Sequence, residues 1–151
     1  TIRLTDAKSR SGIATVECAI VAPFLILLIL AAVDMGQYAN VYQKICDASR
    51  EGARVSARFA TLNTSDVDTA VMEYLQKVFP SESPATLATM AEVTVHDSEG
   101  IPLSSGDLAS IASGSQVVVT VTLQYDSVRW ITHLGILNGN EVTATSMMRR
   151  E

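Results

Sequence analysis

The chain has 151 residues, a formal net charge of −5 at pH 7 and 48% hydrophobic residues, while only 18% of its residues are charged. This length allows one modest domain with an additional helix and is too short for two full domains. The acidic balance argues against a nucleic-acid partner, because such partners are bound through clusters of Lys and Arg that neutralise phosphates.

The first twelve residues, TIRLTDAKSRSG, form a basic segment with Arg3, Lys8 and Arg10 against the single Asp6. A basic segment before a long apolar run predicts a cytoplasmic amino terminus and an exported remainder. A cleavable secretory signal is the competing interpretation. It is disfavoured because the apolar run that follows is longer than the 7 to 15 residues typical of such signals.

The apolar run extends from Ser11 to Val33 and is interrupted only by Glu17. Sixteen residues without a charge separate Glu17 from Asp34. A helix needs about 20 apolar residues to cross the hydrocarbon core of a membrane, so this run predicts a transmembrane helix. A buried core helix is disfavoured, because a chain of this size rarely needs a helix that is apolar on every face.

Two residues within the run are exceptional. A carboxylate in an apolar helix costs several kcal/mol unless it is paired. Glu17 is therefore expected either to meet a cationic group of a neighbouring subunit or to reach the lipid interface.

Pro23 removes a backbone donor and crowds the preceding turn, so a kink is predicted there.

From Asp34 the pattern becomes amphipathic, and one helix is predicted over residues 13–60. Such a helix would be roughly 70 Å long, so half of it must project into lipid or neighbouring subunits. Ala48, Gly52 and Ser56 form a row of small residues that permits close approach of another backbone. The sequence leaves open whether a neighbouring subunit or the chain's own sheet packs against this row.

The second half of this helix also carries Arg50, Arg54 and Arg58, interleaved with Asp47 and Glu51. Acidic residues at three-residue spacing favour a solvated face with ion pairs over a phosphate-binding site. The two cysteines, Cys18 and Cys46, would lie roughly 42 Å apart on one continuous helix, which excludes an intrachain disulfide.

Residues 61–151 predict an exported α+β head. A turn at 61–64 precedes a helix that Ser65 and Asp66 cap and that ends near Phe79, and residues 85–91 predict another helical turn. Alternating apolar residues then predict strands at 92–96, 115–126 and 141–149, and residues 128–137 fit either helix or loop. We expect a small antiparallel sheet of about three strands packed on the second half of the long helix.

No arrangement of residues predicts catalysis. His96 and His133 are thirty-seven residues apart without a nearby cysteine or histidine, so the spacing of a metal site is missing. The sequence contains no G-x-S-x-G nucleophile motif. We therefore expect a non-enzymatic protein without a cofactor or metal.

Three motifs in the first 54 residues carry a resemblance. They are G-I-A-T-V-E-C-A-I-V-A-P-F-L-I-L-L from Gly12 to Leu28, D-M-G-Q-Y at 34–38 and A-S-R-E-G-A-R from Ala48 to Arg54. Together they resemble the TadE-like pilin-related family of the tight-adherence (Tad) pilus system. The resemblance implies a type IV pilin-like subunit and cleavage by a prepilin peptidase between Gly12 and Ile13.

The implied organisation has three parts: a leader-like segment at 1–12, a long helix at 13–60 and a head at 61–151. The implied partners are identical or related pilin-like subunits, first in the inner membrane and then in an extracellular filament. A minor pseudopilin or single-pass component of the assembly apparatus is the alternative. The expected assembly residues are Glu17, Pro23, Phe24, Asp34, Gly36, Ala48, Gly52 and Ser56.

Overall fold

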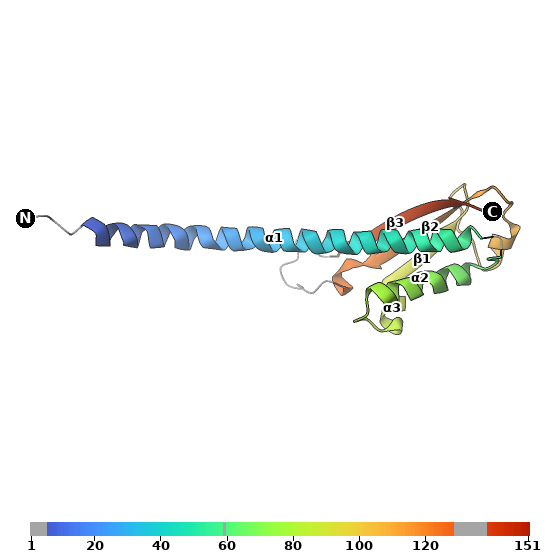
Figure 1. The fold of residues 1–151 in the computed structure, drawn as a ribbon, viewed down its shortest axis with the longest axis horizontal. Helices are drawn as coiled ribbons and strands as arrows, with labels where there is room; N and C mark the ends of the chain where they lie inside the picture. Colours follow the sequence, from blue (N-terminus) through green and yellow to red (C-terminus); the bar gives the residue numbers. More distant parts are fainter. Residues whose placement is uncertain (1–5, 59, 129–138) are drawn as a thin grey trace, which may run out of the picture.

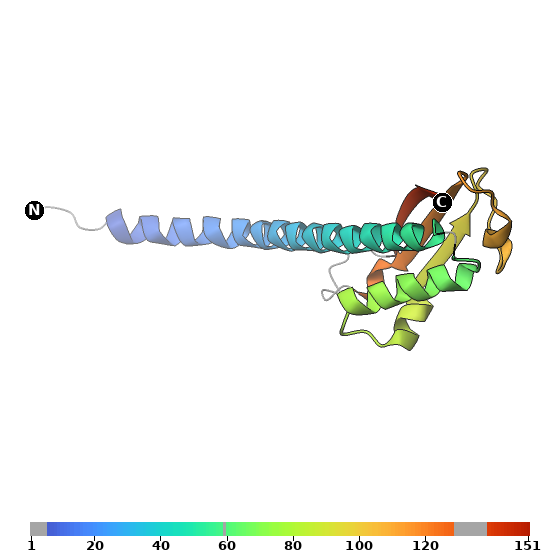
Figure 2. The same cartoon turned by 45° about the vertical axis from the view of Figure 1, so that its right-hand side comes forward.

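The computed structural model is a long helix with a small α+β head on its carboxy-terminal half (Figure 1). It describes residues 6–58, 60–128 and 139–151, with the backbone alone at 6–11 and 13. Helix α1 (Asp6–Ser56) has 51 residues and is therefore about 75 Å long. Its amino-terminal half projects away from the head as a free rod in both views (Figures 1 and 2).

The predicted boundaries of α1 are wrong at both ends. The helix begins at Asp6, inside the predicted leader-like segment, and ends four residues before the predicted end. The kink expected at Pro23 is absent, because the described helix continues through this residue as a straight rod (Figures 1 and 2). Thr61 terminates the helix by donating its hydroxyl to the carbonyl oxygen of Val55 at 2.8 Å.

The two helices that follow pack beside α1. Helix α2 (Thr64–Val78) buries Val67, Val71 and Leu75 along one face, as the four-residue spacing predicted. The residue that precedes its first turn is Asn63, in an extended conformation, so the predicted cap at Ser65 is two residues late. The short helix α3 (Pro84–Met90) begins after Ser83, whose hydroxyl accepts a hydrogen bond from Thr86 N at 3.2 Å, and matches the predicted helical turn.

The sheet has the antiparallel order β1-β2-β3, with strands β1 (Ala91–His96), β2 (Gln116–Gln124) and β3 (Glu141–Arg149). The predicted three-stranded antiparallel sheet is confirmed. Two 3₁₀ turns, η1 (Asp107–Ser110) and η2 (Tyr125–Ser127), flank β2. The segment predicted as helix or loop lies mostly outside the described residues.

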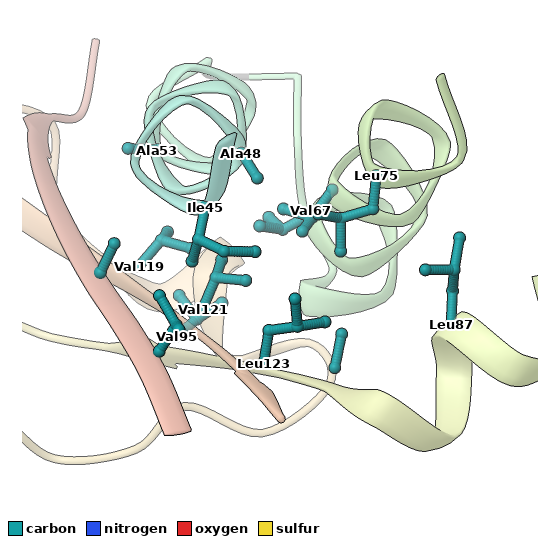
Figure 3. Close-up of a cluster of buried hydrophobic side chains, with 14 of the residues drawn as sticks. Ile45, Ala48, Ala53, Val67, Leu75, Leu87, Val95, Val119, Val121 and Leu123 are labelled. Atoms are coloured by element: carbon teal, nitrogen blue, oxygen red, sulfur yellow. The ribbon is translucent and has the colours of Figure 1, made fainter. Parts of the chain in front are cut away.

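The core lies between the sheet and the pair α1 and α2 (Figure 3). Alternate residues of β2 are fully buried, and they belong to the same core cluster as Ile45 of α1 and Leu75 of α2 (Figure 3). The opposite sheet face carries threonines paired across strands, Thr120 with Thr145 at 3.2 Å and Thr122 with Thr143 at 3.1 Å. One sheet face therefore binds α1 and the other faces solvent.

Candidate assembly surface

The amino-terminal half of α1 exposes its apolar side chains on all sides. Phe24 is 71% exposed and Leu28 67% exposed, and the most apolar eighteen-residue window of the helix has no buried residue. By length and composition α1 can cross a membrane, and it is the one described helix that can. Exposed apolar surface of this extent marks a membrane or protein contact.

The predicted site residues in this half lie on the free rod. Gly12 is exposed and sits within the helix, as does the backbone of Ile13, so the predicted cleavage position falls inside α1. Glu17 is exposed, and within the described part of the chain no ion pair reaches it. A carboxylate on an apolar helix surface is costly unless it is paired.

A small polar cluster marks the junction between the rod and the head. Asp34 is 7% exposed, and the hydroxyl of Tyr125 lies 3.1 Å from its Oδ1 atom and 3.2 Å from its carbonyl oxygen. The ring of Tyr125 also meets Tyr38 edge to face at 5.3 Å between ring centres. The cluster fixes the head to α1 one residue after the apolar run ends.

A pocket of about 560 Å³ opens beside this cluster, between α1, the end of α2 and the turn after β2. Its lining includes Gln37, Lys44 and Tyr125. The ammonium group of Lys44 lies 4.5 Å from the centre of the Phe79 ring and donates to the carbonyl oxygen of Val78 at 3.2 Å. Lys44 therefore fastens the end of α2 to α1.

The row of small residues packs against other elements of the same chain. Ala48, Gly52 and Ser56 are all buried. A Cβ atom on Gly52 would lie 2.7 Å from Cγ2 of Val71 and 3.0 Å from Cγ1 of Val119. The row therefore lets α1 approach α2 and β2, and it is not available as a surface for a neighbouring subunit. Of the expected assembly residues in the second half of α1, Gly36 alone stays exposed.

The charged face of α1 is solvated, as predicted. Arg50 donates to Asp47 at 2.9 Å, and Arg54 binds Glu51 through two nitrogens. The Arg54 guanidinium lowers the pKa of the Glu51 carboxyl below its ordinary value. These are exposed pairs three residues apart, which contribute little to stability.

The carboxy-terminal residues hold the end of α1. Arg150 is 3% exposed, and its guanidinium donates to the carbonyl oxygens of Thr61 at 3.0 Å and Ser56 at 3.4 Å. The backbone N–H of Glu151 donates to the carbonyl oxygen of Ala57 at 2.9 Å. A cation and donors at this position satisfy carbonyls that a helix end leaves unpaired.

In the described part of the chain, no cluster of three or more His, Cys, Asp or Glu side chains could hold a metal ion. A family model described as TadE-like protein matches residues 12–54. Residues 12–54 are TadE-like. No curated protein matches the chain, and no solved structure does.

The TadE-like segment coincides with the candidate surface. It begins at the predicted cleavage position and ends two residues before the end of α1, so it contains the apolar rod, the Asp34 junction and most of the helix face that binds the head. A TadE-like segment on one long apolar helix fits a component associated with the Tad pilus, and this helix is compatible with membrane anchoring.

Sequence reasoning missed three residues that fix α1 and the turn after it to the head: Lys44, Tyr125 and Arg150. Tyr125 had a weak signal, because it continues the alternation of β2 although it follows the strand. Arg150 had none, since a basic residue near the end of a chain is ordinarily solvated.

Proposed function

We propose that this chain is a pilin-like structural subunit of an extracellular filament, assembled through the apolar half of α1. The observation that carries the proposal is the free apolar rod, which is TadE-like in sequence and contacts no other described part of the chain. A non-catalytic role agrees with a site that consists of packing surfaces.

The energetics favour burial of this rod among neighbouring subunits. Ten large apolar side chains from Val16 to Val33 are more than one third exposed. Relative to exposure in water, full burial of each contributes about 1.5 to 3 kcal/mol, so a rod that has left the membrane is stable only when neighbouring subunits cover it. Contacts between different surfaces of identical subunits do not close and therefore generate fibres.

Before assembly the rod would lie in the inner membrane. The basic residues ahead of it favour a cytoplasmic amino terminus, and the head would then be exported. A prepilin peptidase would release the segment before Ile13. The α-amino group that forms there would give Glu17 of a neighbouring subunit a cationic partner.

The second candidate is a minor pseudopilin or membrane-anchored component of a Tad-type assembly apparatus. One helix that can cross a membrane is sufficient for this role. In this case the chain would prime or anchor the apparatus without forming fibres of its own.

Shearing separates the two candidates. Cells that express the full chain together with its assembly genes are sheared, and the released material is sedimented and viewed by negative-stain electron microscopy. A structural subunit is expected in long fibres free of an inner-membrane marker protein. A chain that stays entirely in the membrane fraction while fibres form without it would contradict the proposal. The intact mass of the released chain shows whether it begins at Ile13.

A further inference from the structure

The two edges of the sheet differ in how the chain treats them. The edge formed by β1 is covered by the chain itself, because the segment after His96 turns back and pairs with it. Leu103 N donates to the carbonyl oxygen of Val95 at 2.7 Å, and His96 forms an isolated bridge with Pro102. The other edge is β3 (Glu141–Arg149), and no described segment pairs with its outer side.

The backbone of β3 presents a row of unpaired groups at this edge. Just beyond the two ends of the strand, Arg150 N donates to Ser115 O at 2.8 Å and Tyr125 N donates to Asn140 O at 3.1 Å. Hydrogen-bonded and non-bonded positions alternate along an antiparallel pair, so the even-numbered residues of β3 bond to β2. The N–H and C=O groups of the odd-numbered residues therefore point away from the sheet. These residues, here called the edge residues, are Glu141, Thr143, Thr145, Met147 and Arg149.

Among the described residues, none of the usual devices protects this edge. Natural sheets avoid edge-to-edge pairing with a bulge, a proline or a lysine in the edge strand, or with a covering segment. The register of β3 with β2 is continuous, so the strand has no bulge, and its sequence EVTATSMMR has neither proline nor lysine. All the edge residues are exposed, and Met147 is 67% exposed. The edge of β3 is therefore open to an additional strand.

The edge residues are complementary to themselves when the strand is turned around. We propose that β3 pairs antiparallel with β3 of a second copy of this chain, about a two-fold axis at Thr145. In this register Glu141 lies opposite Arg149 of the second copy, and the same ion pair forms again at the other end of the strand. Between the ends, Thr143 lies opposite Met147 of the second copy.

The charges select this register and this occupant. Among the antiparallel registers that place edge residues opposite one another, the one centred on Thr145 pairs the whole strand. Moving the axis by one residue separates Glu141 from Arg149 of the second copy by two positions, and the stabilisation from directly opposed charges is lost. A strand of another protein would have to carry the reversed order of charges by chance, whereas a second copy carries it by symmetry.

Both charged side chains are available for these ion pairs. Glu141 and Arg149 are exposed. The guanidinium of Arg149 donates through Nε to the carbonyl oxygen of Gly114 at 2.7 Å, and its two terminal nitrogens have no partner among the described residues. A carboxylate can bind these two nitrogens without breaking the bond to Gly114.

The surroundings of β3 leave room for the contact. On the α1 side of the sheet Met148 is 40% exposed, and in the proposed register it lies opposite Val142 of the second copy, which would cover it further. The part of α1 beside β3 carries small side chains. Ser49 Oγ lies 2.8 Å from Ser146 Oγ, and Ala53 points toward the β3 side of the helix (Figure 3). Small side chains at this position let the α1 helices of the two copies lie next to each other.

The pairing also fixes the direction of the two rods. A two-fold axis through Thr145 reverses β3, and it reverses α1 as well, because the two elements run in the same general direction (Figures 1 and 2). The apolar rods then project to opposite sides, so the pair forms between copies that point in opposite directions and not within one fibre. In fibres the contact would join two that run in opposite directions, and only this last step rests on the proposed function.

The experiment is thiol crosslinking of the full chain in detergent, where no fibre is required. All variants carry Cys18→Ala and Cys46→Ala, and the reagent is a bis-methanethiosulfonate with a short spacer. Thr145→Cys lies on the two-fold axis, with about 5.5 Å between the two Cα atoms, and is expected to give a crosslinked dimer. Thr143→Cys is the matched control on the same strand and face. Its two copies lie about 14 Å apart, four residues along a strand, and are expected to remain uncrosslinked.

A mixture of two variants and an exchange of charges test the register. Thr143→Cys mixed with Met147→Cys is expected to give a crosslinked heterodimer, whereas neither variant alone gives a dimer. In the Thr145→Cys chain, Glu141→Arg and Arg149→Glu each place like charges at both ends and should reduce the dimer severalfold at low salt. The two substitutions together restore opposite charges and should restore the dimer. Near-UV circular dichroism of the tyrosines checks that the head of each variant is folded.

Three results would overturn the inference. They are equal crosslinking of Thr145→Cys and Thr143→Cys, charge variants that crosslink as well as the Thr145→Cys chain, and a folded double exchange that does not restore the dimer. On sheared fibres viewed by negative-stain electron microscopy, Glu141→Arg should lower the share of fibres that lie in bundles and leave the number of fibres unchanged. Bundles that persist unchanged in this variant would also overturn the inference. Absence of fibres would contradict the proposed function alone, because the crosslinks in detergent test the contact without them.

Discussion

Gly52 is the position where one added methyl group should reveal how closely α1 binds the head. The Cβ of Gly52→Ala would lie 2.7 Å from Cγ2 of Val71 and 3.0 Å from Cγ1 of Val119. Both valines are fully buried and their branched side chains are stiff, so they cannot turn away without moving the backbone. Overpacking of this kind costs about 1 to 3 kcal/mol.

Gly36→Ala is the matched control, because it lies in the same helix with nothing within 4 Å of its added Cβ. Alanine is favoured over glycine inside a helix by about 0.8 to 1 kcal/mol. This gain is common to both variants, so the difference between them isolates the steric cost. Gly36→Ala is expected to be neutral or stabilising, and Gly52→Ala to be less stable than Gly36→Ala by about 1 to 3 kcal/mol.

The measurement is thermal unfolding of the full chain in detergent, followed by near-UV circular dichroism of the tyrosines. Each kcal/mol shifts the midpoint of a chain of this length by about 2 to 4 °C. Near-UV circular dichroism reports on the head, because Tyr38 and Tyr125 are in contact there. Equal midpoints for the two alanine variants would refute the close approach of α1 to α2 and β2.

Three other substitutions test separate parts of the structure. Glu17→Ala should reduce the number of sheared fibres while the unfolding midpoint of the head stays unchanged, and a normal fibre yield would rule out a role for this carboxylate in assembly. Tyr125→Phe should destabilise the head by about 1 to 3 kcal/mol, the cost of leaving the buried Asp34 carboxylate with fewer partners; an unchanged unfolding midpoint would show that the hydroxyl contributes nothing. Arg150→Met should cost about 1.5 to 3 kcal/mol, because it removes charged donors from the carbonyl of Ser56 at the end of α1 and from that of Thr61 in the turn that follows, and faster amide exchange in the last turn of the helix would locate the effect.

The elements that could be predicted are those with a local signal. A run of apolar residues long enough to span a membrane indicated the rod, and alternation in Val117, Val119 and Val121 indicated the face of β2 that is buried. Local signals were weaker at the ends of elements. Ser65 resembled a helix start, but the extended residue before the first turn of α2 is Asn63.

The junction between rod and head could not be predicted, because it depends on residues distant in sequence. Asp34 and Tyr125 are 91 positions apart, and Arg150 is 94 positions from Ser56. The packing partner of the small-residue row could not be predicted for the same reason. Gly52 permits close approach of any backbone, and only the tertiary fold shows that Val71 and Val119 pack against it.

The way the head is fixed to α1 also determines how it responds to mechanical force. The head lies alongside the second half of the helix, with β3 running in the same general direction (Figures 1 and 2). It is bonded at Asp34 where the contact begins and at Ser56 where it ends. A pull on the rod along its axis therefore shears the whole contact at once and does not peel it turn by turn, so the head is held most firmly against tension along the helix.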